Sequence, residues 1–369
     1  MNEDRVISEL RKAGADVIIS LPCDKNKLLT DMLHQEFPVV DITREEDGVG
    51  ISAGMTLAGR RPVISIQSSG IGNMMNAIMS LTACYSLPMF ILASWRGTES
   101  EKIEAQIPFN SKVPELLKVY GIGCSVVEKE GDIHLISEAM EDAFGNSKIS
   151  VILIKPELWG GSKRLPQEYP SRMRMTPSIG SEVFPEPVLT RLEAIRAVMS
   201  SIRDEDVVVS NIGVPSKEVH ASKDRPLNFY MLGSYTQATP IGLGIALSTE
   251  RDVIVIDGDG SMLGSSVLPV LVSEHPRNLT VVCLDNGAFG STGNQIDQAY
   301  SAVDLTSVAK AFGIPDVRMV STEDGIRDAM SGRGNGLRFV HVPIKAFNSD
   351  SPNITMTAAE IRDRFMSAL

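Results

Sequence analysis

VIVIDGDGSMLG, residues 253–264, joins a run of four apolar, mostly β-branched residues to a glycine-rich loop, and a helical pattern follows the loop. This order predicts a buried strand that ends at the carboxyl edge of a parallel sheet, where open α/β sheets bind ligands. The loop alone leaves three interpretations open. They are an ordinary strand-to-helix turn, a dinucleotide site with G-x-G-x-x-x-G spacing, and a metal–diphosphate site in which Asp259 binds the metal.

Strand-like and helix-like segments alternate through most of the chain. Continuous apolar runs such as PVISIQ and LTVVCLD, separated by helical patterns, predict parallel strands covered by helices on both faces. Residues 161–187 are rich in Pro, Gly, Ser and charge and have no period, which is typical of a linker. We therefore expect an α/β protein with two doubly wound parallel-sheet domains, 1–160 and 188–369, and no middle domain.

Composition and charge narrow the classes of function. The chain has 369 residues, of which 43% are hydrophobic and 22% charged, and its formal net charge is −11. This balance is typical of a globular protein and argues against nucleic-acid binding. The four cysteines have no CxxC spacing, the first residues (MNEDRVISEL) do not resemble a signal peptide, and no apolar run is long enough to span a membrane. We expect a cytoplasmic protein that binds neither nucleic acid nor membrane.

A second strand end distinguishes between the three interpretations of the glycine loop. LTVVCL runs into DNGAFGSTGNQ, in which Asn286 lies 286 − 259 = 27 residues beyond Asp259, across one helix. If the two strands are neighbours, about 4.8 Å apart, both side chains can reach one Mg²⁺ ion, whose ligands lie at about 2.0–2.1 Å. A dinucleotide loop has no use for this acid. The spacing therefore favours a metal–diphosphate site.

These residues resemble the signature of thiamine diphosphate enzymes, in which a GDG is followed by a pair of asparagines. Asp285 stands at the first position of that pair, and Asn286 matches the metal ligand at the second. The resemblance implies thiamine diphosphate and Mg²⁺ as cofactors, pyrimidine-binding and diphosphate-binding domains, and Asp259, Asn286 and Ala288 as metal ligands. Further cofactor contacts implied in the second domain are Asn211, Gly213, Ser216, Gly233, Ser234, Tyr235, Gly258, Gly260 and Ser261.

The segment 233–236 is similar to the G-S-M-G segment of these enzymes. The resemblance implies that the Gly233 carbonyl accepts a hydrogen bond from the cofactor's 4′-amino group. It also implies that Tyr235, where Met or Ile is usual, wedges the cofactor into its bent shape. Thr236 stands where the family has a second glycine.

The resemblance also implies a catalytic glutamate that hydrogen-bonds the aminopyrimidine ring from the first domain. The stretch DITREEDGVGISAGMTLAG, residues 41–59, offers two candidates. Related decarboxylases place this residue nine positions before a helix glycine, and counting back from Gly54 selects Glu45 over Glu46. Acids are also common at helix N-termini because they interact favourably with the dipole. Gln67, at another strand end, is a further candidate cofactor contact.

Several motifs, including TREEDGVGISAG and LDNGAFGSTGNQ, look most like the short decarboxylases that act on 3-sulfopyruvate or 3-phosphonopyruvate. The resemblance implies a carboxy-lyase that converts 3-sulfopyruvate to sulfoacetaldehyde and CO₂ in coenzyme M biosynthesis. Phosphonopyruvate decarboxylation is the alternative. A thiamine-dependent carboligase and a non-catalytic cofactor-binding protein remain further alternatives.

The expected 2-oxoacid substrate carries two anionic groups, and so needs cations or hydrogen-bond donors from the protein. Lys25 or Lys27 is the first candidate. The other candidate contacts are Asn73, Arg96, Gln106, Ser291 and Thr292. Because Glu45 and the metal ligands lie in different halves, and such halves meet between subunits in this family, we expect an obligate homodimer or a larger even assembly.

Overall fold

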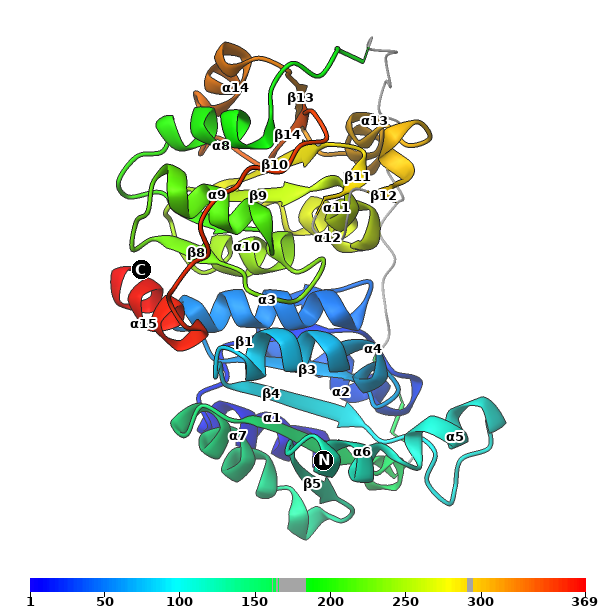
Figure 1. Cartoon of the computed structure of the whole chain (residues 1–369). Helices are drawn as coiled ribbons and strands as arrows, with labels where there is room; N and C mark the ends of the chain where they lie inside the picture. The colour runs from blue at the N-terminus through cyan, green and yellow to red at the C-terminus, as the bar shows by residue number, and fades with distance from the viewer. Residues whose placement is uncertain (161, 164, 166–183, 291–294) are drawn as a thin grey trace. The chain divides into compact units, whose positions relative to one another are not determined.

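The chain divides into two compact units, Met1–Ser171 and Arg172–Leu369. The computed structural model describes residues 1–160, 162–163, 165, 184–290 and 295–369. Each unit contains a six-stranded parallel sheet with helices on both faces (Figure 1). This confirms the prediction of two doubly wound α/β domains. Most of the predicted linker, 161–187, lies outside the described residues, so the exact domain limits stay predictions.

In unit 1 the strands lie in the order β2-β1-β3-β4-β6-β5, and every neighbouring pair is parallel. The strands are β1 (Val17–Ser20), β2 (Val39–Asp41), β3 (Pro62–Gln67), β4 (Met89–Ser94), β5 (Gly123–Val127) and β6 (Ile149–Ile154). The helices are α1 (Asn2–Lys12), η1 (Asp24–Asn26), α2 (Lys27–Glu36), α3 (Glu45–Leu57), α4 (Gly70–Ala77), η2 (Ile78–Ala83), η3 (Glu104–Gln106), α5 (Ile107–Asn110), α6 (Val113–Val119), η4 (Glu130–Asp132), α7 (Leu135–Gly145) and η5 (Pro156–Trp159).

Helices cover both faces of the unit 1 sheet because its central strands are apolar on both sides. Helices α3 and α4 lie over one face, and α1 and α7 lie over the other (Figure 1). On the α1 and α7 side, Leu10 and Met140 pack in one cluster with Ile18, Phe90 and Ile152 of the strands. Strands buried on both faces read as continuous apolar runs, which is why β3, β4 and β6 were visible in the sequence.

In unit 2 the parallel sheet has the order β13-β14-β10-β9-β7-β8, and a small antiparallel hairpin pairs β11 with β12. The strands are β7 (Val207–Ser210), β8 (Asn228–Tyr230), β9 (Val253–Gly258), β10 (Leu279–Asp285), β11 (Ala288–Phe289), β12 (Gln295–Ile296), β13 (Asp316–Met319) and β14 (Arg338–Pro343). The helices are α8 (Arg191–Ser200), α9 (Val214–Ser222), α10 (Ala238–Ala246), α11 (Asp259–Gly264), α12 (Val267–Glu274), η6 (Gln298–Tyr300), α13 (Leu305–Phe312), α14 (Glu323–Met330) and α15 (Ala358–Ala368).

The glycine-rich stretch differs from expectation at one point. The sequence placed a turn at 257–261 and a helix from 264 onward, but α11 begins at Asp259 itself, and α12 follows after a break at 265–266. The hairpin and α15 were not predicted. Within the described part of the chain, no helix is long and apolar enough to cross a lipid bilayer.

Candidate active site

Asp259 and Asn286 meet at the carboxyl edge of the unit 2 sheet. Strands β9 and β10 are parallel neighbours, and their register pairs Gly258 with Leu284. Asp259 directly follows β9, and Asn286 directly follows β10. Both side chains are largely buried, with 4% and 9% of each residue exposed. The expectation that the two strands are neighbours is therefore confirmed.

The Asn286 amide, Asp259 and the Ala288 carbonyl converge on one point. One amide atom lies 3.2 Å from Asp259 Oδ2 and 2.8 Å from the Ala288 carbonyl oxygen. If that atom is nitrogen, it donates a hydrogen bond to Asp259 Oδ2 and another to the Ala288 carbonyl oxygen. If it is oxygen, the Asn286, Asp259 and Ala288 oxygens lie close together. Without a cation the first orientation is more stable, whereas Mg²⁺, which binds oxygen, would favour the second. The three residues therefore fit a divalent cation.

The surroundings of Asp259 are strongly acidic. Burial, together with the carboxylates of Asp285 and Asp297, raises the pKa of Asp259 to about 8. Asp259 accepts backbone hydrogen bonds at 2.9 Å from Gly260 and 3.3 Å from Ala288. A bound cation would supply the charge that these carboxylates lack. In the described residues no group of three or more His, Cys, Asp or Glu side chains could hold a metal, so a metal here would need amide and carbonyl oxygens in addition to the Asp259 carboxylate.

Asp285 has a different environment from Asp259. Its Oδ2 lies 2.8 Å from Nε2 of His341, a fully buried residue on β14, and the Thr306 hydroxyl lies 2.7 Å from Nδ1 of the same ring. Although burial raises it, the hydrogen bond and charge of His341 hold the pKa of Asp285 below its ordinary value. Asp285 also accepts the Gly287 N–H at 2.9 Å. It therefore shapes the turn that presents Asn286 and Ala288.

A cavity of about 280 Å³ opens beside the Asp259–Asn286 pair. Its walls come from the segments that follow β7, β9 and β10, together with Arg191 and Tyr235. The predicted cofactor contacts that line it are Asn211, Tyr235, Gly258, Asp259, Gly260, Ser261, Asn286 and Ala288. Ser261 Oγ is buried and makes no hydrogen bond of standard geometry in the described residues. A buried hydroxyl that lines the cavity beside Asp257 suits a phosphate oxygen.

Of the cofactor contacts predicted in unit 2, four do not line the cavity. Ser216 is turned into the protein, where its hydroxyl lies 2.7 Å from the Asn211 carbonyl oxygen and 2.8 Å from Ser210 Oγ. Gly213 precedes helix α9 with a φ of +81°, a conformation that suits glycine. Gly233 and Ser234 lie in the segment after β8. Their contacts with the cofactor stay predictions.

The segment 233–236 keeps the backbone of a glycine-containing turn without its second glycine. Ser234 and Thr236 have φ angles of +71° and +73°, in the left-handed region that β-branched residues rarely adopt. The Tyr235 hydroxyl donates to the Gly260 carbonyl. The Tyr235 ring packs beside Gly264, where an added Cβ atom would stand 3.1 Å from Cε1 of the ring. Tyr235 therefore ties this segment to helix α11, and Thr236 occupies a strained position.

Glu45 lies at the start of helix α3, against the start of helix α4. Its Oε2 accepts a hydrogen bond from Asn73 Nδ2 at 3.0 Å. A Cβ atom on Gly70 would stand 2.5 Å from Glu45 Cγ, so only glycine leaves room for this side chain. Glu46 instead pairs with Arg44 at 3.1 Å. The two candidate glutamates thus have different partners, and only Glu45 lies against α4.

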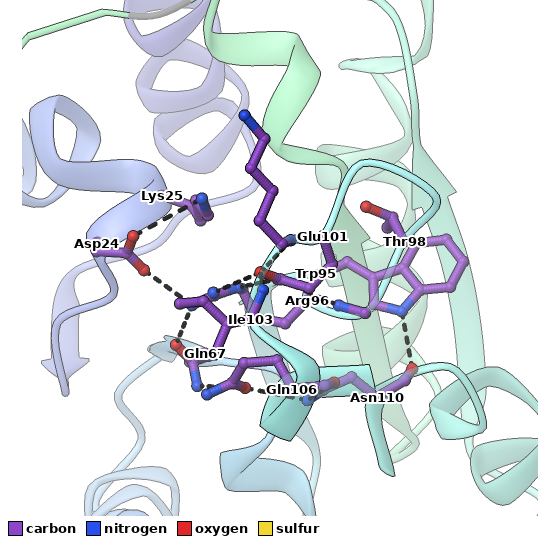
Figure 2. Close-up of polar contacts among 12 residues, drawn as sticks. Asp24, Lys25, Gln67, Trp95, Arg96, Thr98, Glu101, Ile103, Gln106 and Asn110 are labelled. Atoms are coloured by element: carbon purple, nitrogen blue, oxygen red, sulfur yellow. Dashed lines mark hydrogen bonds and ion pairs between the residues drawn. The ribbon is translucent and has the colours of Figure 1, made fainter. Parts of the chain in front are cut away.

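A buried polar cluster lies at the carboxyl ends of β3 and β4 (Figure 2). Arg96, whose side chain is 2% exposed, donates to both carboxylate oxygens of Glu101, at 2.6 and 3.1 Å. Its Nη1 donates to Asp24 at 2.8 Å and to Gln67 Oε1 at 2.9 Å. Gln67 Nε2 in turn donates to Gln106 Oε1 at 3.2 Å. Two carboxylates therefore surround one guanidinium, which leaves little of its charge for an anionic substrate.

The predicted substrate contacts fall into three groups. Arg96 and Gln106 belong to the buried cluster, and Lys25 Nζ lies beside it, 3.8 Å from Asp24 Oδ2 (Figure 2). Asn73 contacts Glu45 instead. Ser291 and Thr292 lie outside the described residues. Contact of any of these residues with substrate stays a prediction.

Three residues at this site were not predicted from the sequence: Arg191, His341 and Asp297. His341 interrupts the apolar run FVHVP, residues 339–343, and a polar residue in a buried strand was an available signal. Arg191 and Asp297 gave no such signal, because each is far in sequence from the residues it joins. Their positions follow from the fold of unit 2 alone.

Comparison with known families and relatives gives a consistent result. Residues 3–113 match the N-terminal TPP binding domain of thiamine pyrophosphate enzymes, and residues 214–342 match the C-terminal TPP binding domain. Sulfopyruvate decarboxylase of Methanosarcina acetivorans is 38% identical, with 100% of this chain and 97% of that protein aligned. Phosphonopyruvate decarboxylase of Streptomyces viridochromogenes is 29% identical over 98% of this chain and 93% of that protein.

The two halves also match separate proteins. In Methanothermobacter thermautotrophicus, the beta subunit of sulfopyruvate decarboxylase is 41% identical over 48% of this chain and 95% of the subunit. The alpha subunit is 30% identical over 43% of this chain and 98% of the subunit. Among solved structures, a thiamin diphosphate-dependent enzyme from Mycobacterium smegmatis superposes with a TM-score of 0.72 at 14% identity, over 94% of this chain and 99% of that one. This last likeness shows the fold.

Proposed function

Because the chain belongs to the thiamine pyrophosphate enzyme family, we propose that it decarboxylates 3-sulfopyruvate to sulfoacetaldehyde and CO₂. The observation that carries the substrate assignment is the end-to-end alignment with a sulfopyruvate decarboxylase at 38% identity. This activity would place the protein in coenzyme M biosynthesis, and we place it in the cytoplasm.

The cofactor assignment rests on the geometry of unit 2. Asp259, Asn286 and the Ala288 carbonyl would hold Mg²⁺, and the buried Ser261 hydroxyl faces the space that a diphosphate would take. Bound thiamine diphosphate supplies a carbon nucleophile that also accepts the electrons released with CO₂. The protein's own part is to hold the diphosphate, exclude water and place a proton-carrying group at the pyrimidine ring. Glu45 is that group, and Asn73 and Gly70 fix where its carboxylate lies.

We further propose that two copies of the chain share their sites. Glu45 belongs to unit 1 and the metal ligands belong to unit 2, and the corresponding halves of a relative are separate subunits. Glu45 of one copy would then complete the cofactor site of another copy. A homodimer, or a larger even assembly, follows from this exchange.

Phosphonopyruvate is the second candidate substrate, because a phosphonopyruvate decarboxylase aligns over 98% of this chain at 29% identity. A phosphonate and a sulfonate differ in charge and in one proton. Because both groups are anionic, cationic surroundings can bind either one. The acidic partners of Arg96 reduce the positive charge near the buried cluster, which favours the less charged sulfonate.

The decisive experiment measures CO₂ release from 3-sulfopyruvate, 3-phosphonopyruvate and pyruvate with Mg²⁺ and thiamine diphosphate present. We expect kcat/KM to be highest for 3-sulfopyruvate, with sulfoacetaldehyde as product. A higher value for 3-phosphonopyruvate would reverse the substrate assignment. Cofactor binding without CO₂ release from any of the three would indicate a non-catalytic protein. A C–C coupled product in the presence of an added aldehyde would indicate a carboligase.

A further inference from the structure

Arg191 occupies an unusual position for an arginine. It is the first residue of helix α8 and only 5% exposed, although a cation is disfavoured at the positive end of a helix dipole. The helix does not need it there, because Thr190 and Glu193 form a capping box that satisfies the first turn. Arg191 nevertheless lines the same cavity as Asp259, Ser261 and Asn286. Its placement is therefore better explained by the cavity than by the helix.

One side of the Arg191 guanidinium is fixed by neighbouring side chains. Its Nε donates to Glu218 Oε2 at 2.7 Å and its Nη2 donates to Asn348 Oδ1 at 2.8 Å. Glu218, on helix α9, is fully buried and also accepts a hydrogen bond from Ser349 Oγ at 2.7 Å. In the described part of the chain, Nη1 makes no hydrogen bond. The guanidinium is thus held rigidly with one amino group left to bind something else.

The remaining amino group faces the loop that carries Asn286. A Cβ atom on Gly290 would stand 3.2 Å from Arg191 Nη1, 3.1 Å from Asn348 Oδ1 and 3.4 Å from Asn286 Nδ2. Asn348 Nδ2 also donates to the Gly290 carbonyl at 2.8 Å. The missing side chain of Gly290 thus lets the guanidinium approach the metal-binding loop.

The charges around the cavity favour an anionic partner for Nη1. Among the described residues that line the cavity, Arg191 is the one with a cationic side chain, and Asp257 and Asp259 are acidic. A diphosphate carries more negative charge than one Mg²⁺ ion neutralises. Guanidinium groups bind phosphate oxygens through short, charge-assisted hydrogen bonds.

We propose that Arg191 donates through Nη1 to the terminal phosphate of bound thiamine diphosphate. Glu218 and Asn348 are the positioning residues that hold the guanidinium in place. The proposal rests on the cofactor and is independent of which 2-oxoacid the enzyme accepts. It adds to the diphosphate site a charged contact that comes from a helix outside the two loops carrying the metal ligands.

The test compares two ligands that differ by the terminal phosphate. The affinities of thiamine diphosphate and thiamine monophosphate are measured by calorimetry with Mg²⁺, for the wild type and for Arg191→Gln/Glu218→Gln. The double variant avoids leaving Glu218 buried without a partner. Loss of a charged hydrogen bond predicts about 10- to 100-fold weaker binding of thiamine diphosphate. Binding of thiamine monophosphate should change little. The preference of the protein for thiamine diphosphate over thiamine monophosphate should therefore fall.

A matched control is Arg338→Gln/Asp316→Asn, which removes another ion pair of unit 2. This pair lies at the amino ends of β13 and β14, away from the carboxyl edge of the sheet. The control should leave both affinities unchanged. Unchanged diphosphate affinity in the Arg191 variant, or equal losses for both ligands, would overturn the proposal and leave Arg191 a structural role. Failure of the wild type itself to bind thiamine diphosphate would instead overturn the cofactor assignment.

Discussion

Asp285 and His341 form a buried hydrogen-bonded pair next to the turn that carries Asn286 and Ala288. Their side chains are 4% and 0% exposed, and Oδ2 of one lies 2.8 Å from Nε2 of the other. Thiamine diphosphate enzymes usually have asparagine at the position of Asp285. Here the carboxylate has a buried hydrogen-bond partner in His341, and this contact lowers the pKa of Asp285.

This pairing predicts unequal effects of changing its two members. His341→Leu leaves a buried carboxylate without its partner and should lower the free energy of unfolding by about 3–5 kcal/mol. Asp285→Asn restores the family's usual residue, whose amide oxygen can still accept from His341, and should cost about 1 kcal/mol. Urea denaturation at pH 7 measures both. Equal losses for the two variants would mean that the contact with His341 does not explain why Asp285 is tolerated at this buried position.

Asp259 should limit the stability of the metal-free protein and enable cofactor binding. It is 4% exposed and has acidic neighbours in Asp285 and Asp297. Asp259→Asn should therefore raise the thermal midpoint when EDTA is present. The same variant should lose most of the increase in midpoint that Mg²⁺ and thiamine diphosphate produce together in the wild type. An unchanged ligand-induced increase would contradict the assignment of Asp259 as a metal ligand.

Glu45 should affect the rate and not cofactor affinity. Glu45→Gln removes a proton-carrying group and keeps its shape, so we expect kcat to fall about 10²- to 10⁴-fold. The dissociation constant of thiamine diphosphate, measured by calorimetry, should stay within a few-fold of the wild type. Glu46→Gln is the matched control, because Glu46 pairs with Arg44, and it should retain activity. A large loss in the control with none in Glu45→Gln would reassign the catalytic residue.

Gly70 offers a way to move Glu45 without replacing it. The Cβ atom of Gly70→Ala would stand 2.5 Å from Glu45 Cγ, so the flexible glutamate side chain must shift. We expect kcat to fall at least tenfold while the free energy of unfolding changes by less than about 1 kcal/mol. Gly131→Ala is the control, since nothing lies within 4 Å of its added Cβ. Equal activities of the two variants would show that the position of Glu45 does not matter.

Much of the fold could be predicted because its physical signals are local. Apolar runs such as 253–256 mark parallel strands, and the spacing of Asp259 and Asn286 across one helix places both at one sheet edge. The start of α11 at Asp259 was missed, because a GDG sequence has low helix propensity and its helical conformation depends on packing in the sheet. Helix α15 was not predicted, because no strand pattern lies next to it in the sequence to indicate another strand–helix unit.

The remaining parts of the site depend on contacts between distant segments. The partners of Arg191, at positions 218 and 348, and the pairing of Asp285 with His341 follow only from sheet order. The sequence also suggested Arg96 as a substrate contact. It could not show that Glu101 and Asp24 surround this side chain, because the loop after β4 has no regular period.

The Arg96–Glu101 pair should make stability depend on pH in the acidic range. The hydrogen bond from Arg96 holds the pKa of Glu101 at about 2, below its ordinary value of 4.5. The pair's contribution is therefore fully present above pH 4.5 and is lost as pH falls toward 2. Glu101→Gln should lower the free energy of unfolding at pH 7 on the order of 2 kcal/mol. The wild type and variant should converge near pH 2.

Urea denaturation between pH 2 and pH 7 measures this convergence. Glu99→Gln is the control, because the Glu99 side chain is 90% exposed and its nearest cation, Lys155, is 3.9 Å away. It should follow the wild-type curve throughout, since exposed pairs contribute little. Curves for wild type and Glu101→Gln that stay parallel down to pH 2 would mean that ionised Glu101 does not stabilise the loop after β4. The cluster in Figure 2 would then owe its rigidity to its neutral hydrogen bonds.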